Sequence, residues 1–211
     1  MSILDFPTSI IGPGQMQLTP LANTQSGGRS PFDGTEQTLE LPGGRWKAVL
    51  TYRLAGTEAR TLEAFLARLG GRAGRFRWGP PGHALQGNAQ FSVATTAAID
   101  GAAQTGSMIH LKGWTPYAQD IFLPGDYLAW LDPSGRPQLH MVTNPGGVPA
   151  DSSGLCSTPI WPPIRRSPAD GAAINFSTPH GIFRLSEDEV VVTHSPAGVA
   201  DFTINIEEAL V

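Results

Sequence analysis

The residues from Arg45 to Trp78 read RWKAVLTYRLAGTEARTLEAFLARLGGRAGRFRW and predict a strand, a helix and a second strand. The first run alternates like a strand with one buried face, and its apolar positions are Trp46, Ala48, Leu50, Tyr52 and Leu54. The middle run has the spacing of a helical stripe, at Leu62, Phe65, Leu66 and Leu69. Gly70 and Gly71 end the helix, because glycine adopts the left-handed conformation without a Cβ clash. The alternation resumes at Phe76.

The composition favours many short strands. The chain has 211 residues, enough for one large domain or two small ones, and its 25 glycines and 19 prolines favour strands joined by turns over a helical bundle. Charged residues make up only 15%, which argues against a disordered chain. A single cysteine excludes a disulfide framework within the chain. No run approaches the ~20 apolar residues of a membrane span, so we expect no membrane partner.

The segments on either side also indicate strands and turns. Before the central stretch we expect a short edge strand around Met16, a polar loop at Leu21–Gly34 and a strand at Thr35–Leu41. After it, apolar runs recur at roughly 8–12-residue spacing with turns between them, which predicts a small barrel or sandwich. Its expected strands include the alternating residues Phe91, Val93 and Thr95, both halves of Ile121–Leu131, and Gln138–Thr143. The last strands are expected near residues 174–176, 181–185, 189–193 and 200–207.

Basic residues are concentrated in the central stretch. It holds eight basic and two acidic residues, a local balance of +6, whereas the whole chain has a net charge of −4. The basic residues are Arg45, Lys47, Arg53, Arg60, Arg68, Arg72, Arg75 and Arg77. Two interpretations stay open: solvated helix and strand faces, or a basic surface that meets an acidic partner subunit or a passing polyanion.

The residues that carry chemistry form no catalytic or metal-binding pattern. The histidines are isolated from one another, and they are His83, His110, His140, His180 and His194. The sequence lacks a GxSxG motif, a P-loop and a dinucleotide-binding fingerprint. We expect Cys156 to be buried and inert, with a thiol nucleophile as the alternative, and Asp126 to cap a turn, with a catalytic acid as the alternative. We therefore expect no enzyme, no metal site and no cofactor.

An aromatic set in the predicted barrel has two interpretations. Its members are Trp114, Tyr117, Phe122, Tyr127 and Trp130. These rings form either a barrel core with a subunit contact or a platform on which sugars stack. The platform makes Trp114, Tyr117 and Trp130 candidate contacts to a glycan or a partner, and it requires Trp114 or Trp130 to be exposed. Single-stranded nucleic acid is disfavoured as a ligand, because residues 89–166 hold few basic side chains.

The order of several segments resembles the distal tail proteins of long-tailed bacteriophages and of gene transfer agents. These segments are the strand–helix–strand unit ending in GRFRWGPPGH, GSMIHLKGW followed by LPGDYL, PPIRRSPADGAAI, and FRLSEDE followed by the closing FTINIEE. The resemblance implies a mainly β (α+β) fold. It predicts a β-sandwich belt domain at residues 1–88 and 167–211, with one packed helix at about 57–69, and an inserted small OB-like β-barrel at 89–166.

The same resemblance implies a function and partners. It predicts a structural virion protein that forms a ring, a hexamer in such proteins, at the distal end of the tail. The ring joins the tail tube protein to the baseplate hub protein, and it is assembled in the bacterial cytoplasm. The alternative is a carbohydrate-binding module at the tail tip that recognises host cell-surface glycans.

A ring around a tail channel constrains the basic stretch. A strongly attractive lumen would hold the DNA that has to pass through it. We therefore expect most of these basic residues to face solvent or acidic side chains of neighbouring subunits, and we expect no sequence-specific nucleic-acid partner. The candidate inter-subunit charge contacts are Arg53, Arg60, Arg68, Arg72, Glu187, Asp188 and Glu189.

Overall fold

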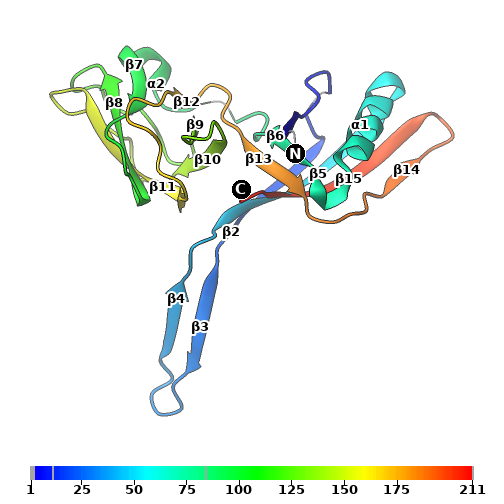
Figure 1. The fold of residues 1–211 in the computed structure, drawn as a ribbon, viewed down its shortest axis with the longest axis horizontal. Coiled ribbons are helices and arrows are strands. Elements are labelled where there is room, and N and C mark those ends of the chain that lie inside the picture. Colours follow the sequence, from blue (N-terminus) through cyan, green and yellow to red (C-terminus); the bar gives the residue numbers. More distant parts are fainter. Residues whose placement is uncertain (1–2, 11, 84, 211) are drawn as a thin grey trace.

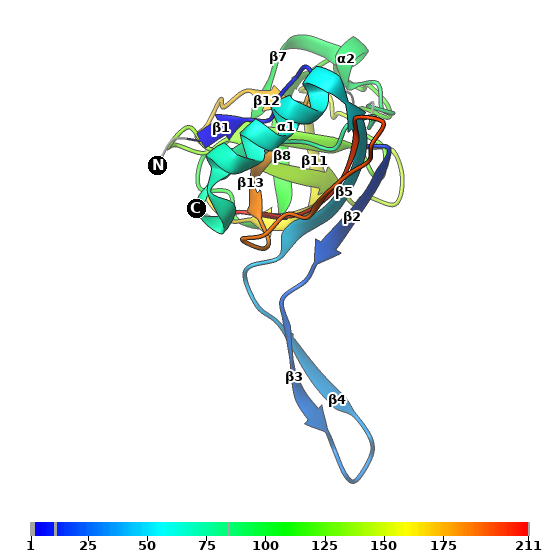
Figure 2. The same ribbon diagram turned by 90° about the vertical axis from the view of Figure 1, so that its right-hand side faces the viewer.

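The computed structural model describes residues 3–10, 12–83 and 85–210. They form two β-sheets that lie side by side, and a two-stranded hairpin that projects away from both (Figures 1 and 2). The fold is mainly β with one long helix, as the sequence predicts. The first sheet is built from both ends of the chain, and the second sheet is built from its middle.

The first sheet holds the strands of the central stretch. Its strands are β1 (Ile3–Asp5), β2 (Gln15–Leu21), β5 (Arg45–Ala55), β6 (Arg75–Trp78), β13 (Gly181–Leu185), β14 (Val192–His194) and β15 (Val199–Glu208). Their order is β1-β6-β13-β15-β5-β2, with β14 paired to β15. The alternation in β5 is confirmed, because every second residue from Trp46 to Leu54 is buried. β15 contributes Phe202, Ile204 and Ile206 to the same core.

The predicted helix lies against this sheet and begins one residue earlier than expected. α1 spans Gly56–Leu69, and the side chains that it buries are Ala59, Leu62, Phe65 and Leu69. It ends where Gly70 adopts the left-handed conformation at φ 64°, as the paired glycines predict. Glu58 in the first turn and Arg68 in the last turn complement the helix dipole. No helix in the described part of the chain is both long and apolar enough to cross a membrane.

The second sheet curls into a nearly closed barrel. Its strands are β7 (Val93–Ile99), β8 (Gly106–Trp114), β9 (Tyr127–Leu131), β10 (Pro137–Val142), β11 (Leu155–Ile164) and β12 (Ile174–Asn175). They follow the order β12-β9-β10-β11-β8-β7. The two ends of this order meet, because Ala98 bridges Ala173 and the Ile99 amide donates to the Ala172 carbonyl at 2.9 Å. The barrel that the apolar runs predict is therefore present.

Trp46 joins the two sheets. Its ring lies 4.6 Å from the ring of Trp161 on β11 and 5.7 Å from that of Tyr127 on β9, measured between centroids. Its indole N–H donates to the Leu139 carbonyl on β10 at 3.2 Å. Tyr127 and Leu139 belong to the core of the first sheet although they lie on barrel strands. The two parts of the molecule therefore share apolar surface.

The hairpin corrects the expectation of a loop at Leu21–Gly34. β2 continues to Leu21, and β3 (Thr24–Arg29) pairs with β4 (Glu36–Glu40), the strand predicted at Thr35–Leu41. Every residue of β3 and β4 is exposed. The loop prediction was wrong because it relied on the polar, turn-rich composition of this segment, and a hairpin with two exposed faces has the same composition. We call β3, β4 and the turn between them the arm.

The barrel departs from the predicted strands in two places. Phe91 lies in the short helix α2 (Ala89–Ser92) rather than in a strand, because the Asn88 carbonyl accepts the amides of Phe91 and Ser92. Ile121 and Phe122 form no strand, yet both are fully buried in the barrel core. Periodicity could not separate such a buried irregular segment from a strand.

Two boundaries near the C-terminal part also move. β12 pairs with β9, and Ile174 belongs to the barrel core, so the barrel strands continue to residue 175 rather than ending by 166. The strand expected at 189–193 is β14, which begins only at Val192 and pairs with the edge of β15. Val191 is exposed, so the apolar run there does not mark a buried strand.

Candidate functional site

The side chains that could carry catalysis do not converge. Among the residues that the structure describes, no three His, Cys, Asp or Glu side chains are close enough to hold a metal ion. Cys156 is 4% exposed, and burial raises the pKa of its thiol to about 12. A thiol with so high a pKa holds almost no thiolate near neutral pH. The expectation that Cys156 is buried is confirmed, and its inertness stays a prediction.

Asp126 has a structural role. It is 2% exposed. Its carboxylate accepts the backbone amides of Gln86 at 2.7 Å, Gly87 at 3.0 Å and Leu123 at 2.8 Å. The expected turn cap is therefore confirmed, and the same carboxylate also fixes a loop nearly forty residues earlier in the sequence. A buried carboxylate held by three amides in this way positions the backbone.

We expect Asp126→Ala to lower the free energy of unfolding by about 3 kcal/mol, because it leaves three amides without their acceptor, two of them from residues that are not exposed. Chemical denaturation followed by tryptophan fluorescence measures this loss. Asp151→Ala is the matched control, since the Asp151 carboxylate accepts two amides within its own exposed turn. Equal losses from the two substitutions would show that burial of the Asp126 cap is unimportant.

Two of the three candidate glycan contacts are buried. Trp114 and Trp130 are each 2% exposed. Trp114 packs edge-on against Phe122 at 5.4 Å, and Trp130 stacks on the His140 ring at 4.2 Å. These rings form the barrel core, so the sugar-platform interpretation of Trp114 and Trp130 is wrong. Tyr117 alone of the three is exposed, and it lies in a turn with a positive φ of 60°.

Most arginines of the central stretch find partners within the same chain. Arg72 donates to both oxygens of Asp188, through its amide at 2.9 Å and its guanidinium at 3.1 and 3.2 Å. The other ion pairs join Arg45 to Glu207, Arg77 to Asp5 and, at 3.9 Å, Arg53 to Asp201. Asp188 therefore meets the basic stretch as expected, but it does so inside one subunit. Glu187 and Glu189 are exposed and take part in no ion pair within the described chain.

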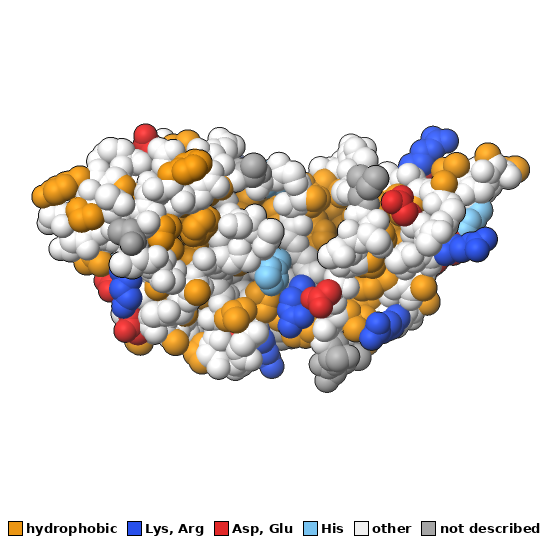
Figure 3. All heavy atoms as spheres, turned by 90° about the horizontal axis from the view of Figure 1, so that it is seen from above, with side chains coloured by type: hydrophobic (Ala, Val, Ile, Leu, Met, Phe, Trp, Pro, Cys, Tyr) orange, Lys and Arg blue, Asp and Glu red, His pale blue; other side chains and the backbone are white. Residues whose placement is uncertain are grey.

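Lys47 on β5 and the residues Arg60 and Arg68 on α1 remain without an acidic partner. Arg60 and Arg68 are both exposed, and neither lies within ion-pair distance of a carboxylate among the described residues. With Ala64 between them they form a row on the outer face of the helix, which we call the α1 ridge. Basic side chains are spaced out over the half of the molecule that carries α1 (Figure 3).

The arm carries the opposite charge. Its acidic residues are Asp33, Glu36 and Glu40, against the single basic residue Arg29. No ion pair within the described chain involves any of them. At the turn, Phe32 is 98% exposed, and Leu39 on β4 is 60% exposed. The arm is thus an acidic hairpin whose two large apolar side chains are exposed in the described structure.

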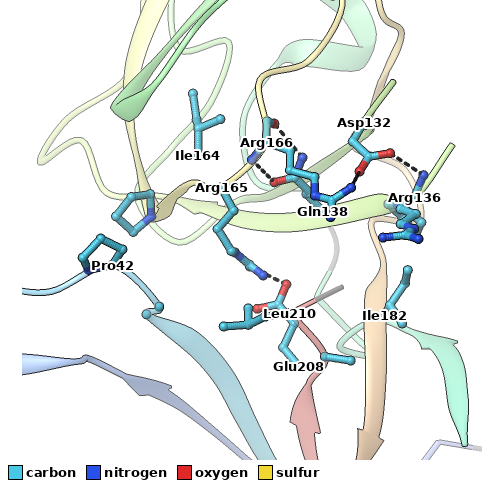
Figure 4. A pocket seen from close by; sticks show the side chains of 15 residues that line it. Pro42, Asp132, Arg136, Gln138, Ile164, Arg165, Arg166, Ile182, Glu208 and Leu210 are labelled. Atoms are coloured by element: carbon cyan, nitrogen blue, oxygen red, sulfur yellow. Dashed lines mark hydrogen bonds and ion pairs between the residues drawn. The ribbon is translucent and has the colours of Figure 1, made fainter. Parts of the chain in front are cut away.

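A cavity of about 460 Å³, lined by several charged side chains, lies where the barrel meets the first sheet (Figure 4). Glu208 at the end of β15 is 3% exposed and accepts a hydrogen bond from Arg165, just after β11, at 2.5 Å. Its other oxygen accepts the Trp46 amide at 3.2 Å. Arg166 points instead to Asp132, at 3.6 Å. Of the charged residues that line the cavity, Glu208 pairs with Arg165 and Asp132 pairs with Arg166, whereas the Arg136 guanidinium takes part in no ion pair within the described chain.

Burial governs the ionisation of this junction. It raises the pKa of Glu208 to about 7 although Arg165 acts in the opposite direction. It also lowers the pKa of Arg165. His140 is fully buried, and burial lowers its pKa to about 3, so the ring is neutral and its Nδ1–H donates to the Pro162 carbonyl at 2.7 Å. Sequence reasoning missed the pair of Glu208 and Arg165, whose only signal was charge at the ends of two predicted strands.

A second cavity of about 710 Å³ is mainly apolar. It lies beside β6, and its lining includes Tyr52, Trp78, Pro80, Pro81, His83 and His180. The Asp5 and Arg77 side chains at its edge are joined at 2.9 Å. It offers shape and aromatic surface, and the carboxylate among its described lining residues is that of Asp5, which is paired with Arg77.

No protein-family model and no curated protein matches the sequence. The geometry therefore has to indicate the function. It presents two outward-facing charged features that form no ion pair with the described residues, the acidic arm and the basic α1 ridge, and both suit contacts between macromolecules.

Proposed function

We propose that the chain is a structural virion protein that assembles into a ring at the distal end of a bacteriophage tail. In this role it joins the tail tube to the baseplate hub. The observation that carries the assembly part of the proposal is the arm, which projects from the body with both faces in solvent (Figures 1 and 2). The resemblance of the sequence to distal tail proteins supports the tail part.

An arm of this kind is poorly suited to a free subunit. A two-stranded hairpin without a third strand or a packed helix is marginally stable in water. This arm also exposes Phe32 and Leu39, which gain stability only when another surface covers them. A partner that covers one face supplies the missing layer. The arm is therefore best explained as a segment that orders and buries itself on assembly.

Ring closure requires two different surfaces on each subunit. A contact from one surface to another repeats around a rotation axis and closes when the rotation divides a full turn. The arm supplies the first surface and the body supplies the second. Because each subunit then contributes one surface of each kind, the proposal needs no self-complementary patch. The resemblance to distal tail proteins favours six subunits in the ring.

The proposal predicts that deleting the arm abolishes assembly and leaves the body folded. Residues 24–40 can be replaced by a short glycine linker, because the arm is a sheet of its own and pairs with no strand of the body. Mass measurement and negative-stain imaging, with the tail tube and hub proteins present, are expected to show rings for the full chain and monomers for the deletion. The free energy of unfolding in urea serves as the control, and it should be the same for the full chain and the deletion variant.

A full chain that stays monomeric with both partners present would contradict the proposal. A deletion variant that still forms rings would contradict the role of the arm. Binding of the intact chain to bacterial glycans, without assembly, would favour the glycan-recognition alternative. The two barrel tryptophans proposed for that role, Trp114 and Trp130, are buried and do not support it.

A further inference from the structure

We propose that strand β4 of one copy lies along the α1 ridge of the next copy, with Glu36 and Glu40 paired to Arg60 and Arg68. This inference rests on the proposed function, because it names the contact that builds the ring. It commits the ridge to one occupant, a second copy of the same chain.

The ridge has the shape and charge to receive a strand. Arg60, Ala64 and Arg68 follow one another at intervals of four residues, the spacing that places side chains in one row on a helix. All three are exposed, whereas the opposite face of α1 packs on the first sheet. The small side chain of Ala64 leaves room for a strand to approach between the two guanidinium groups.

The arm has a matching row. Glu36, Thr38 and Glu40 alternate along β4, so their side chains share one face, and Leu39 points to the other. On β3, Thr24 lies opposite Glu40 and Ser26 lies opposite Thr38, so the β3 side chains beside them on this face are small and polar. Arg29 lies opposite Glu36 in register, but it is not within ion-pair distance of a carboxylate in the described chain.

The spacing of the two rows agrees. Four residues of strand separate Glu36 from Glu40, about 13 Å at the rise of an antiparallel strand. Eight residues of helix separate Arg60 from Arg68, about 12 Å along the helix axis. Both carboxylates can therefore meet both guanidinium groups at once, in the paired geometry that arginine favours with carboxylates. Thr38 then faces Ala64.

Other acids do not compete for the ridge within the subunit. Glu63 on the same helix lies 3.3 Å from the His194 ring instead. Glu58 is half-buried in the first turn and has no ion pair in the described chain. The ridge therefore stays cationic in one copy, and the acidic face of the arm stays anionic, until the two meet. Because both rows are exposed to solvent, salt should weaken the contact.

The decisive experiment is a charge swap, read by the protein concentration at which half of the chain is in rings. Glu36→Lys with Glu40→Lys is expected to raise this concentration at least about tenfold, since two attractions become two repulsions. Arg60→Glu with Arg68→Glu should do the same. Combining all four substitutions restores the pairs in reverse and should return assembly to within about threefold of the original chain.

A matched control changes the same net charge elsewhere. Glu187→Lys with Glu189→Lys replaces two exposed carboxylates outside the arm, at residues that the sequence also makes candidates for inter-subunit contacts. Assembly should stay unchanged, and a loss as large as that of the arm variant would give the ridge a different acidic partner and overturn the contact. Short thiol cross-linkers test the contact directly, because Cys156 is buried and the introduced cysteines would be the reactive ones. Glu36→Cys combined with Arg60→Cys or Arg68→Cys should give a ladder of covalent oligomers, and the more efficient pair reports the direction of the strand.

The outcomes separate this contact from the ring itself. Rings that form normally in all charge variants overturn the contact and leave the proposed function standing. An original chain that never assembles with tail tube and hub proteins overturns both. If Arg60→Glu with Arg68→Glu keeps the rings but loses binding to a DNA duplex, the ridge faces the channel and the contact is overturned. Loss in both paired variants with recovery in the fourfold variant supports it.

Discussion

Replacing Gly113 by alanine is expected to lower the free energy of unfolding by about 3–5 kcal/mol and to open the barrel. Gly113 lies in β8 with a positive φ of 99°, a conformation that strains any residue with a Cβ. A Cβ at this position would also stand 2.2 Å from the Thr96 carbonyl oxygen and 2.8 Å from its carbon. These are backbone atoms of β7, so no side chain can rotate to relieve the clash.

Gly106→Ala is the matched control for this prediction. Gly106 lies in the same strand with a φ of 81°, but a Cβ there meets nothing within 4 Å. It therefore carries the backbone strain without the clash, and we expect a loss of about 1–2 kcal/mol. Urea unfolding followed by the fluorescence of the buried tryptophans measures both variants. Similar losses would mean that the approach of β7 to β8 does not determine barrel stability.

The sequence predicts those helices and strands that have one buried face and one solvent-exposed face. β5, α1 and β15 each separate apolar from polar residues at a regular period, so their positions are predicted to within a few residues. Both faces of the arm are exposed to solvent, so its sequence has no regular alternation of apolar and polar residues. Ile121 and Phe122 are apolar for a different reason, because they fill the barrel core from an irregular segment.

The candidate site was less predictable than the fold. Charge counting located the basic stretch, but it could not show that Arg72 would be satisfied by Asp188 while Arg60 and Arg68 stayed free, because those pairings join residues far apart in the sequence. The acidic partner proposed for the ridge lies in β4, which the sequence predicts as a strand at Thr35–Leu41. Its partner strand β3 lies in the segment that was interpreted as a loop, so the sequence did not indicate that the two strands form a hairpin.

The junction between the sheets shows the same limit. The Glu208 carboxylate is bound by an arginine 43 residues away and by an amide 162 residues away. Neither partner could be inferred from a local pattern. The Glu207 and Glu208 side chains look alike in the sequence, yet Glu207 pairs with Arg45 and Arg184 nearer the surface, and Glu208 is enclosed.

We expect Arg165→Met to lower the free energy of unfolding by about 3–5 kcal/mol at about pH 8, because it leaves a buried carboxylate without its cation. Methionine keeps most of the apolar stem of arginine, so the loss reflects the charge rather than a cavity. Arg166→Met is the control in the same cavity. The Arg166 side chain is 48% exposed. When Arg166 is replaced, the Asp132 carboxylate still accepts hydrogen bonds from the amides of Ser134 and Arg136.

The cost of Arg165→Met should depend on pH. The pKa of Glu208 is already raised in the folded state, from 4.5 to about 7, so its stabilising contribution is complete below pH 4.5 and is lost as the pH rises through about 7. Removing Arg165 removes the charge that opposes this rise, and the pKa of Glu208 should rise further. The variant therefore loses more stability than the original chain above pH 7, whereas near pH 5 the carboxyl is protonated in both and the difference shrinks.

The titration of His140 also changes stability with pH, so its effect has to be separated from that of Glu208. Burial, with a smaller effect of Arg165, lowers the pKa of His140 to about 3, so its neutral ring destabilises the folded state as the pH falls below its ordinary value of 6.5. Repeating the series in a Glu208→Gln background isolates the carboxyl, because glutamine cannot titrate. If Glu208 is the cause, the excess loss above pH 7 disappears in that background. An excess that persists above pH 7 would assign the effect to packing, because His140 titrates below pH 7 in both the folded and the unfolded state. The ionisation of Glu208 would then have no part in holding the two sheets together.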